Sequence, residues 1–273
     1  MNPTEDRSGI DLPVLYRDDH LVAVHKPVGL LVHPSRIAAG EKRCAMKLLR
    51  DRLGRWVYPV HRLDRPTSGV LLFALTPDVA RTLGEQFSGT RVVKTYLAVV
   101  RGWPAAEGIV DHPLKEIRDP AAGSRPGRPE PPRAAVTRYR TLTTTEVPYR
   151  VDRYSTSRYA LVEVCPESGR RHQIRRHFKH LSHPVIGDTT YGKSGHNHLF
   201  QEMFGSERLL LVAVGLGFIH PDSGRPFHIV GPPESGFQRV VDALGWSRES
   251  RACRGSKSVA VELQKFAQPR SDT

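Results

Sequence analysis

The stretch His61–Gly69, with the sequence HRLDRPTSG, places one carboxylate between two arginines just before a turn. An apolar run follows at Val70–Leu75 and predicts a buried strand. Positive charge near a carboxyl group favours its ionised form, so Asp64 is expected to be negatively charged. An ionised carboxylate can act as a nucleophile or as a general base. The alternative is an ordinary surface salt bridge beside the turn.

A second informative stretch, Glu167–His177, has the sequence ESGRRHQIRRH and opens the most basic segment of the chain. A helix is expected over residues 170–181, with its apolar residues in one narrow arc that faces the core. Arg171 and Arg175 lie at the edge of this arc, from which an arginine can reach a buried carboxylate or a phosphate. Three other basic residues are expected to point away from the arc, toward solvent or RNA: His172, Arg176 and His180. A solvated basic face is the alternative.

The charge balance indicates the kind of partner. The 273 residues contain 41 Lys and Arg against 28 Asp and Glu, which gives a formal net charge of +13. A polyanion, above all a nucleic acid, is the natural partner of such a chain. A protein that is merely basic is the alternative.

Other features exclude several classes of protein. Three scattered cysteines without CxxC spacing favour neither structural zinc nor a disulfide framework, and they fit a reducing, cytoplasmic setting. His177 and His180 have no carboxylate or thiolate ligand nearby in the sequence, so no metal site is predicted. No run approaches the ~20 apolar residues of a membrane helix, and no signal peptide is evident.

Short strands joined by both hairpins and helices predict an α+β fold rather than a doubly wound parallel sheet. Strands are expected at residues 14–16, 21–24, 70–75, 92–100, 136–142, 159–164, 209–218 and 227–230. Helices are expected at residues 45–53, 77–87, 170–181 and 236–244. One catalytic domain is expected over residues 11–246, between a flexible N-terminus at residues 1–10 and a basic, disordered tail at residues 247–273. Residues 118–133, which hold five prolines and two glycines, are expected to form a surface loop.

The two basic stretches resemble the HRLDxxTSG and GRxHQxRxH motifs of the RluA-type pseudouridine synthases. Residues 94–98, KTYLA, are similar to the KxYxA motif of the same family, and the resemblance extends over residues 13–245. It implies the pseudouridine synthase fold, a mixed and largely antiparallel sheet with flanking helices and a central cleft. Within the family, the chain looks most similar to the subgroup that modifies uridine 65 of tRNA.

The resemblance also implies roles for individual residues. Asp64 corresponds to the catalytic aspartate, Arg175 to the arginine that pairs with it, and Tyr96 to the tyrosine that stacks on the target base and is a candidate for proton removal. Alone, a tyrosine in a strand is more often a packing residue. Residues in and around these motifs are expected to bind RNA: His61, Arg62, Arg65, Thr67, Arg171, His172 and Arg176. One departure is Val212, where many relatives have histidine.

The implied activity is the isomerisation of a specific uridine in RNA to pseudouridine. The N-glycosidic bond breaks, the base turns, and the base is rejoined to the ribose through carbon 5. No redox change or external group is involved, so no cofactor is expected. The expected substrate is tRNA at uridine 65, with ribosomal RNA as the alternative, and the protein is expected to be a monomer without membrane association.

Two other classes of function compete with this interpretation. A non-catalytic RNA-binding protein could use the same basic surface, but phosphate binding gives no reason for an acid at the centre of a basic motif. A nucleoside or glycoside hydrolase would use an aspartate nucleophile and usually needs a second carboxylate as acid. No second acid has a comparable setting in the sequence.

Overall fold

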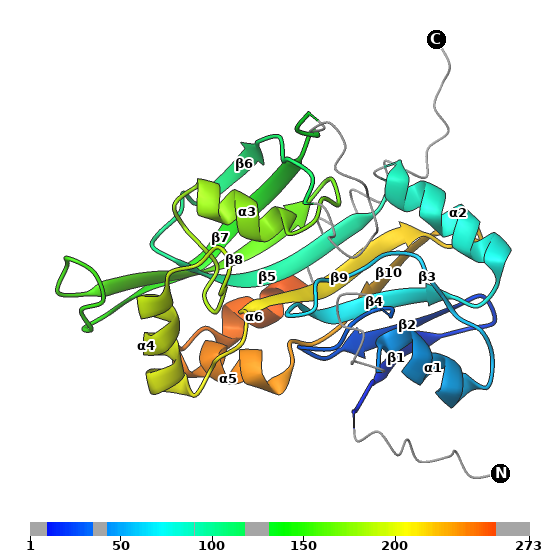
Figure 1. Cartoon of the computed structure of the whole chain (residues 1–273), viewed down its shortest axis with the longest axis horizontal. Helices are drawn as coiled ribbons and strands as arrows, with labels where there is room; N and C mark the ends of the chain where they lie inside the picture. Colours follow the sequence, from blue (N-terminus) through cyan, green and yellow to red (C-terminus); the bar gives the residue numbers. More distant parts are fainter. Residues whose placement is uncertain (1–9, 35–42, 90, 118–130, 255–273) are drawn as a thin grey trace.

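The computed structural model describes residues 10–34, 43–89, 91–117 and 131–254 (Figure 1). A ten-stranded sheet runs through the molecule. Its main path is β1 (Val14–Arg17), β2 (Leu21–Lys26), β4 (Ser68–Ala74), β9 (Leu211–Ile219), β5 (Val93–Arg101), β8 (Ser157–Pro166), β7 (Val136–Val147) and β6 (Glu107–Asp111). β10 (Pro226–Val230) pairs with β9, and β3 (Tyr58–Pro59) pairs with β4.

The strand pairing confirms the expected α+β fold with a mixed, largely antiparallel sheet. Among the described strands, β4 and β9 form the one parallel pair, at the centre of the sheet. β4 is buried along its whole length, as its run of apolar residues predicted. The strand begins at Ser68, inside the HRLDRPTSG motif, so the motif leads directly into the middle of the sheet.

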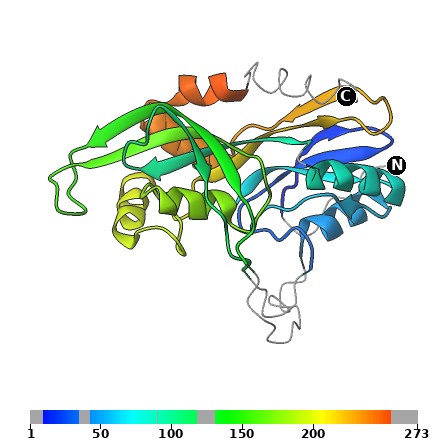
Figure 2. The same cartoon turned by 90° about the horizontal axis from the view of Figure 1, so that it is seen from above.

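Six helices are described: α1 (Ala45–Leu53), α2 (Pro77–Ser88), α3 (Gln173–His180), α4 (Ser194–Phe204), α5 (Ser235–Ala243) and α6 (Ser247–Arg254). Figure 2 shows α6 on the opposite side of the sheet from α3. The start of α2 matches the sequence expectation, because the Thr76 hydroxyl accepts a hydrogen bond from the Val79 N–H and Pro77 occupies the first turn.

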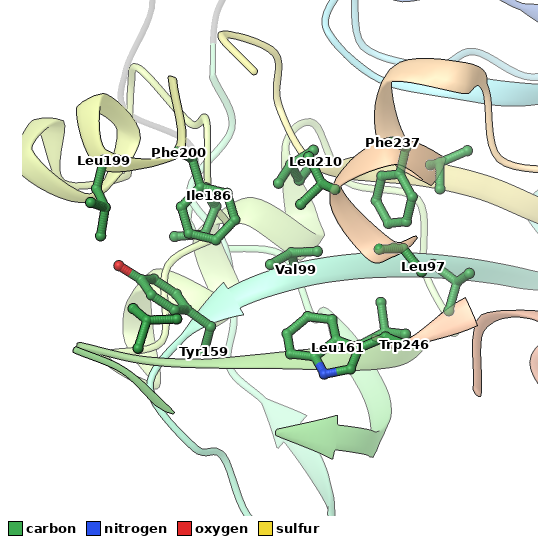
Figure 3. Close-up of a cluster of buried hydrophobic side chains, with 14 of the residues drawn as sticks. Leu97, Val99, Tyr159, Leu161, Ile186, Leu199, Phe200, Leu210, Phe237 and Trp246 are labelled. Atoms are coloured by element: carbon green, nitrogen blue, oxygen red, sulfur yellow. The ribbon is translucent and has the colours of Figure 1, made fainter. Parts of the chain in front are cut away.

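Alternation along β5 divides the core between the two faces of the sheet. Ala98 and Val100 belong to a cluster with Ile174 and Phe178 of α3. Leu97 and Val99 belong to another cluster, which includes side chains of α4 and α5 (Figure 3). Helices α3 and α5 therefore cover opposite faces of β5.

Val212, the departure from the family pattern, lies in this second cluster, opposite Ser68 in the parallel pairing. It is fully buried, so the position is occupied here by an apolar core residue.

Some sequence expectations need correction. The helix expected from residue 170 begins at Gln173, and the tail expected from residue 247 begins with α6. The structure also adds β3, β6 and α4, which were not predicted. The expectations for residues 1–9, for most of the loop at 118–133 and for the tail beyond residue 254 lie outside the described residues.

Candidate active site

A cavity of about 270 Å³ lies between the HRLDRPTSG segment, β5 and the start of α3. Its volume is close to the lower end of the range for small-molecule sites, about 300 Å³. Asp64, Tyr96 and Arg175 all line it, although they are far apart in the sequence. The structure therefore brings together the three residues that the motifs singled out. Among the described residues that line this cavity, Asp64 is the single acid.

Asp64 is held by a turn but keeps its carboxylate available. The backbone N–H of Thr67 donates to the Asp64 carbonyl at 3.0 Å, which closes the turn before β4. One carboxylate oxygen lies 3.6 Å from Nη1 of Arg175, and the other lies 3.8 Å from Nε2 of His172. Both distances exceed that of a hydrogen bond, so these two groups act on the carboxylate mainly through charge and dipole.

Arg175 is fixed by a different acid, Asp188. Its Nε and Nη2 atoms donate to the two carboxylate oxygens of Asp188 at 2.7 and 2.8 Å, in the bidentate geometry that suits a guanidinium group. Burial alone would raise the pKa of Asp188, but hydrogen bonds from Arg175 and from two backbone N–H groups outweigh it and keep that pKa low. Burial would likewise lower the pKa of Arg175, and Asp188 raises it above its usual value. Arg175 therefore presents a permanent positive charge to Asp64.

His172 occupies the cavity, which corrects the expectation that it points away from the core. The helical wheel was wrong here because α3 begins at Gln173, so His172 lies just before the helix. His172 adopts a left-handed backbone conformation with φ 56°. Its Nδ1 atom lies 3.0 Å from the Tyr191 hydroxyl. Burial lowers the pKa of His172 in spite of the opposing effect of Asp64. A neutral ring that accepts from Tyr191 directs its Nε2–H toward Asp64.

Tyr96 and Lys94 form the β5 side of the cavity. Burial and, to a smaller extent, the charge of Asp64 raise the pKa of Tyr96 above its usual value, so its phenol stays protonated. Lys94 donates to the carbonyl of Ser168 at 3.0 Å, and burial lowers the pKa of Lys94 to about 8. The ammonium group thus ties β5 to the segment that precedes α3.

Comparisons with known proteins agree on the family. A family model described as RNA pseudouridylate synthase matches residues 20–180. The tRNA pseudouridine synthase C of Haemophilus ducreyi is 46% identical over 87% of this chain and 97% of its own length. The protein of the same name from Vibrio cholerae is 43% identical over 86% of this chain and 96% of its own. The chain belongs to the RNA pseudouridine synthase family.

Solved structures of the family share the fold. Human RNA pseudouridylate synthase domain containing 4 aligns with a TM-score of 0.64 and 26% identity, over 85% of this chain and 93% of its own. Human RNA pseudouridylate synthase domain containing 1 aligns with a TM-score of 0.62 and 25% identity, over 86% of this chain and 95% of its own. This chain is therefore an RNA pseudouridine synthase, an isomerase that acts on RNA, with the pseudouridine synthase fold.

Sequence reasoning missed several residues that hold the site of this synthase in place. Lys26 is fully buried, and its Nζ donates to the carbonyls of Pro27, Leu30 and Arg65 at 2.9, 2.8 and 3.2 Å. Burial lowers the pKa of Lys26 to about 7. These bonds tie the segment at residues 26–30 to the loop that holds Asp64. In the sequence, Lys26 stands in the short turn sequence KPVG at residues 26–29, which by itself gives the lysine no role.

A second support lies behind the start of β4. Arg208 pairs with Glu234 and donates to the Ser68 hydroxyl at 2.8 Å. It therefore holds Ser68, the first residue of β4, in place. Burial lowers the pKa of Arg208 to about 10. Gly69 follows with φ 112°, and a Cβ atom there would overlap the backbone of Ala213 on β9. The parallel contact between β4 and β9 thus requires glycine at this position of the motif.

The residues expected to bind RNA occupy different settings. His61 stacks on Phe87 and accepts from the Leu72 N–H at 3.0 Å, and burial lowers its pKa to about 3. Thr67 is buried, whereas Arg62 is exposed at the cavity. The other three arginines lie outside the cavity lining, and each donates to a backbone carbonyl. Arg65 donates to Gly29, Arg171 donates to Ile117, and Arg176 donates to Lys115. RNA binding by these residues stays a prediction.

Within the described residues, no group of three His, Cys, Asp or Glu side chains is arranged to hold a metal ion. In the same part of the chain, no helix is long and apolar enough to cross a bilayer.

Proposed function

We propose that this synthase isomerises uridine 65 of tRNA and that Asp64 is its catalytic residue. The observation that carries the proposal is the single carboxylate in the cavity lining, which receives no hydrogen bond from any described residue. The choice of tRNA is supported by the relatives from H. ducreyi and V. cholerae, both named tRNA pseudouridine synthase C.

The geometry supports a division of labour around the bound uridine. The target nucleotide leaves its stack at a cost of a few kcal/mol, and the enclosed cavity accepts it. Asp64 reacts with the nucleoside as nucleophile or base, and the fixed charge of Arg175 stabilises the ionised carboxylate. The bond from N1 to C1′ breaks and the bond from C5 to C1′ forms. C5 loses one proton to water and N1 gains one from water, so the product has the same composition as uridine and the reaction consumes no second substrate.

Tyr96 is assigned as the platform on which the base stacks. Its raised pKa means that the phenol carries its proton at neutral pH. A protonated phenol offers an aromatic face and a hydrogen bond, but it is a weak acceptor for the C5 proton. Arg62, exposed at the cavity, is assigned to fill the space that the extruded base leaves in the RNA.

The substrate is tested with two transcripts of one tRNA, both labelled with tritium at C5 of uridine. One transcript has uridine at position 65, and the other has cytidine there. We expect one equivalent of tritium to be released from the first and none from the second, because the C5 proton is lost when the new glycosidic bond forms. Release from ribosomal RNA but from neither transcript would show that the alternative substrate is the correct one.

We also infer a cytoplasmic monomer. tRNA is available in that compartment, and Asp64, Tyr96 and Arg175 already meet within a single chain, so these three residues need no second copy to come together. Sedimentation equilibrium of the active enzyme at micromolar concentration tests the monomer. A dimer whose dissociation abolishes activity would contradict it.

A further inference from the structure

A second hollow, the α3 groove, lies along α3 outside the catalytic cavity. It has a volume of about 500 Å³ and is bounded by α3, Tyr191 and the two segments at residues 112–115 and 132. Its described lining contains no acid. Lys115, Arg176 and Lys179 contribute positive charge to it.

The α3 groove begins where the catalytic cavity ends. Tyr191 lines the groove, and its hydroxyl contacts the His172 ring, which lines the cavity. The ring of Tyr191 also lies 5.0 Å from the guanidinium carbon of Arg175 and 5.8 Å from Nζ of Lys179. A chain that leaves the cavity past His172 therefore meets the groove next.

The walls of the groove are held in place by contacts that leave its lysines available. Arg176 donates to the Lys115 carbonyl at 2.9 Å, and the buried His177 ring lies 3.1 Å from the His112 carbonyl. The rings of His112 and His180 stack at 3.9 Å. These contacts join α3 to the segment that follows β6.

Neither lysine is neutralised by a neighbouring acid in the part of the chain that the structure describes. Lys115 and Lys179 are both exposed, and no carboxylate lies within ion-pair distance of either ammonium group among the described residues. Glu116, the adjacent acid, pairs with Arg133 at 3.4 Å instead. Cations that have no paired carboxylate and face one hollow are suited to bind a polyanion.

We propose that the α3 groove binds the phosphodiester backbone beside the target nucleotide, with Lys115 and Lys179 each contacting one phosphate. This inference rests on the proposed function, because it gives the path by which the same RNA leaves the catalytic cavity. Phosphate contacts of this kind position the RNA without reading its sequence. Lys115 and Lys179 therefore contribute to RNA affinity and leave the chemical step unchanged.

The test measures tRNA binding as a function of salt for Lys115→Gln, Lys179→Gln and the double variant. Each lost phosphate contact should reduce the slope of log K against log salt by about 0.7–0.9, and the double variant should lose about twice that. KM for tRNA should rise by roughly tenfold for each substitution near 0.1 M salt, while kcat stays unchanged. Arg239→Gln is the matched control, because Arg239 is exposed on α5, across the sheet from α3.

Three results would overturn the proposal that the α3 groove binds RNA. The first is an unchanged salt slope in the double variant, and the second is an equal loss of slope in Arg239→Gln. The third is a fall in kcat with unchanged KM, because it would place the lysines in the chemistry. The unsubstituted enzyme separates this proposal from the earlier one. If uridine 65 is not its target, the unsubstituted enzyme releases as much tritium from the cytidine-65 transcript as from the uridine-65 transcript, or none from either. If only the groove is wrong, the uridine-65 transcript alone releases tritium and the double variant keeps its KM.

Discussion

Among the described residues, two arrangements place a histidine between a tyrosine and an aspartate, and only one of them faces the catalytic cavity. Tyr191 of the α3 groove contacts His172, and His172 lines the cavity and faces Asp64. At the connection between β7 and β8, the Tyr159 hydroxyl lies 2.8 Å from Nδ1 of His196, whose Nε2 lies 3.2 Å from Asp152. His196 belongs to α4, and Figure 1 shows α4 near the end of the β7–β8 hairpin.

The two aspartates differ in how their charge is used. The Asp152 carboxylate is 37% exposed and is surrounded by Arg101, Lys193 and His196 at 3.2–3.4 Å. The hydrogen bond from His196 is the main cause of its lowered pKa. The Asp64 carboxylate is 24% exposed, and its nearest cation is already bonded to Asp188. Residue types therefore do not distinguish the two sites, and Asp152 lines a hollow of its own, of about 370 Å³. What distinguishes Asp64 is a carboxylate that receives no hydrogen bond from a described residue.

The largest expected difference is in kcat when Asp64 and Asp152 are replaced one at a time. Asp64→Asn should lower kcat by at least about 10²–10⁴-fold while tRNA binding changes little, because the amide cannot act as nucleophile or base. Asp152→Asn, the same change in the second arrangement, should leave kcat within about twofold, since surface ion pairs contribute little. Tritium release and tRNA binding by filter retention measure both quantities. Conversion above roughly 1% of wild type in Asp64→Asn, equivalent to less than a 100-fold loss, would remove Asp64 from the mechanism.

The next effect concerns the acid that holds Arg175. Asp188→Asn should lower the free energy of unfolding by about 3–5 kcal/mol, because it leaves a buried guanidinium group without its counter-charge. Arg175 and Asp188 are 4% and 1% exposed, so water cannot replace the lost partner. Urea denaturation measures the loss, and kcat should fall with it. Asp152→Asn should cost less than about 1 kcal/mol in the same assay, and equal losses would mean that burial does not separate the two arrangements.

The sequence predicted the three central residues of the site but not the residues that position them. Asp64, Tyr96 and Arg175 stand in linear motifs, and a linear motif is visible without the fold. Asp188 lies thirteen residues beyond Arg175, and it meets the guanidinium group only because the chain folds back after α3. Its one signal was that it is the first acid after the basic segment.

The strands and helices were predictable where their pattern is local. Thr76 and Pro77 marked the start of α2, and the apolar run marked β4. β6 was missed because it is a short edge strand whose alternate residues are exposed, with little apolar periodicity. His172 was misplaced because a helical wheel assumes a helix, whereas its left-handed backbone turns the ring into the cavity.

A smaller effect separates the two tyrosines. Tyr191→Phe removes the hydroxyl that contacts Nδ1 of His172, so the imidazole near Asp64 loses its orientation. We expect kcat to fall by roughly tenfold, the effect of about 1.4 kcal/mol from one hydrogen bond in the upper part of its usual range. Tyr159→Phe should leave kcat unchanged and lower stability by about 0.5–1.5 kcal/mol. An equal fall in kcat for both variants would show that the loss reflects general destabilisation.

The smallest effect is the pH dependence of stability that the two histidines contribute. Burial lowers the pKa of both His172 and His196 in the folded protein. Below about pH 6.5, the usual histidine value, the unfolded chain therefore binds protons that the folded chain does not, and stability falls as the pH is lowered. His172→Gln and His196→Gln should each flatten this slope between pH 7.5 and 5.5 in urea denaturation. His172 faces Asp64, whereas His196 faces Asp152 outside the catalytic cavity. Only His172→Gln should therefore also lower kcat at pH 7.5. A matching loss of kcat in His196→Gln would make the two arrangements functionally equivalent.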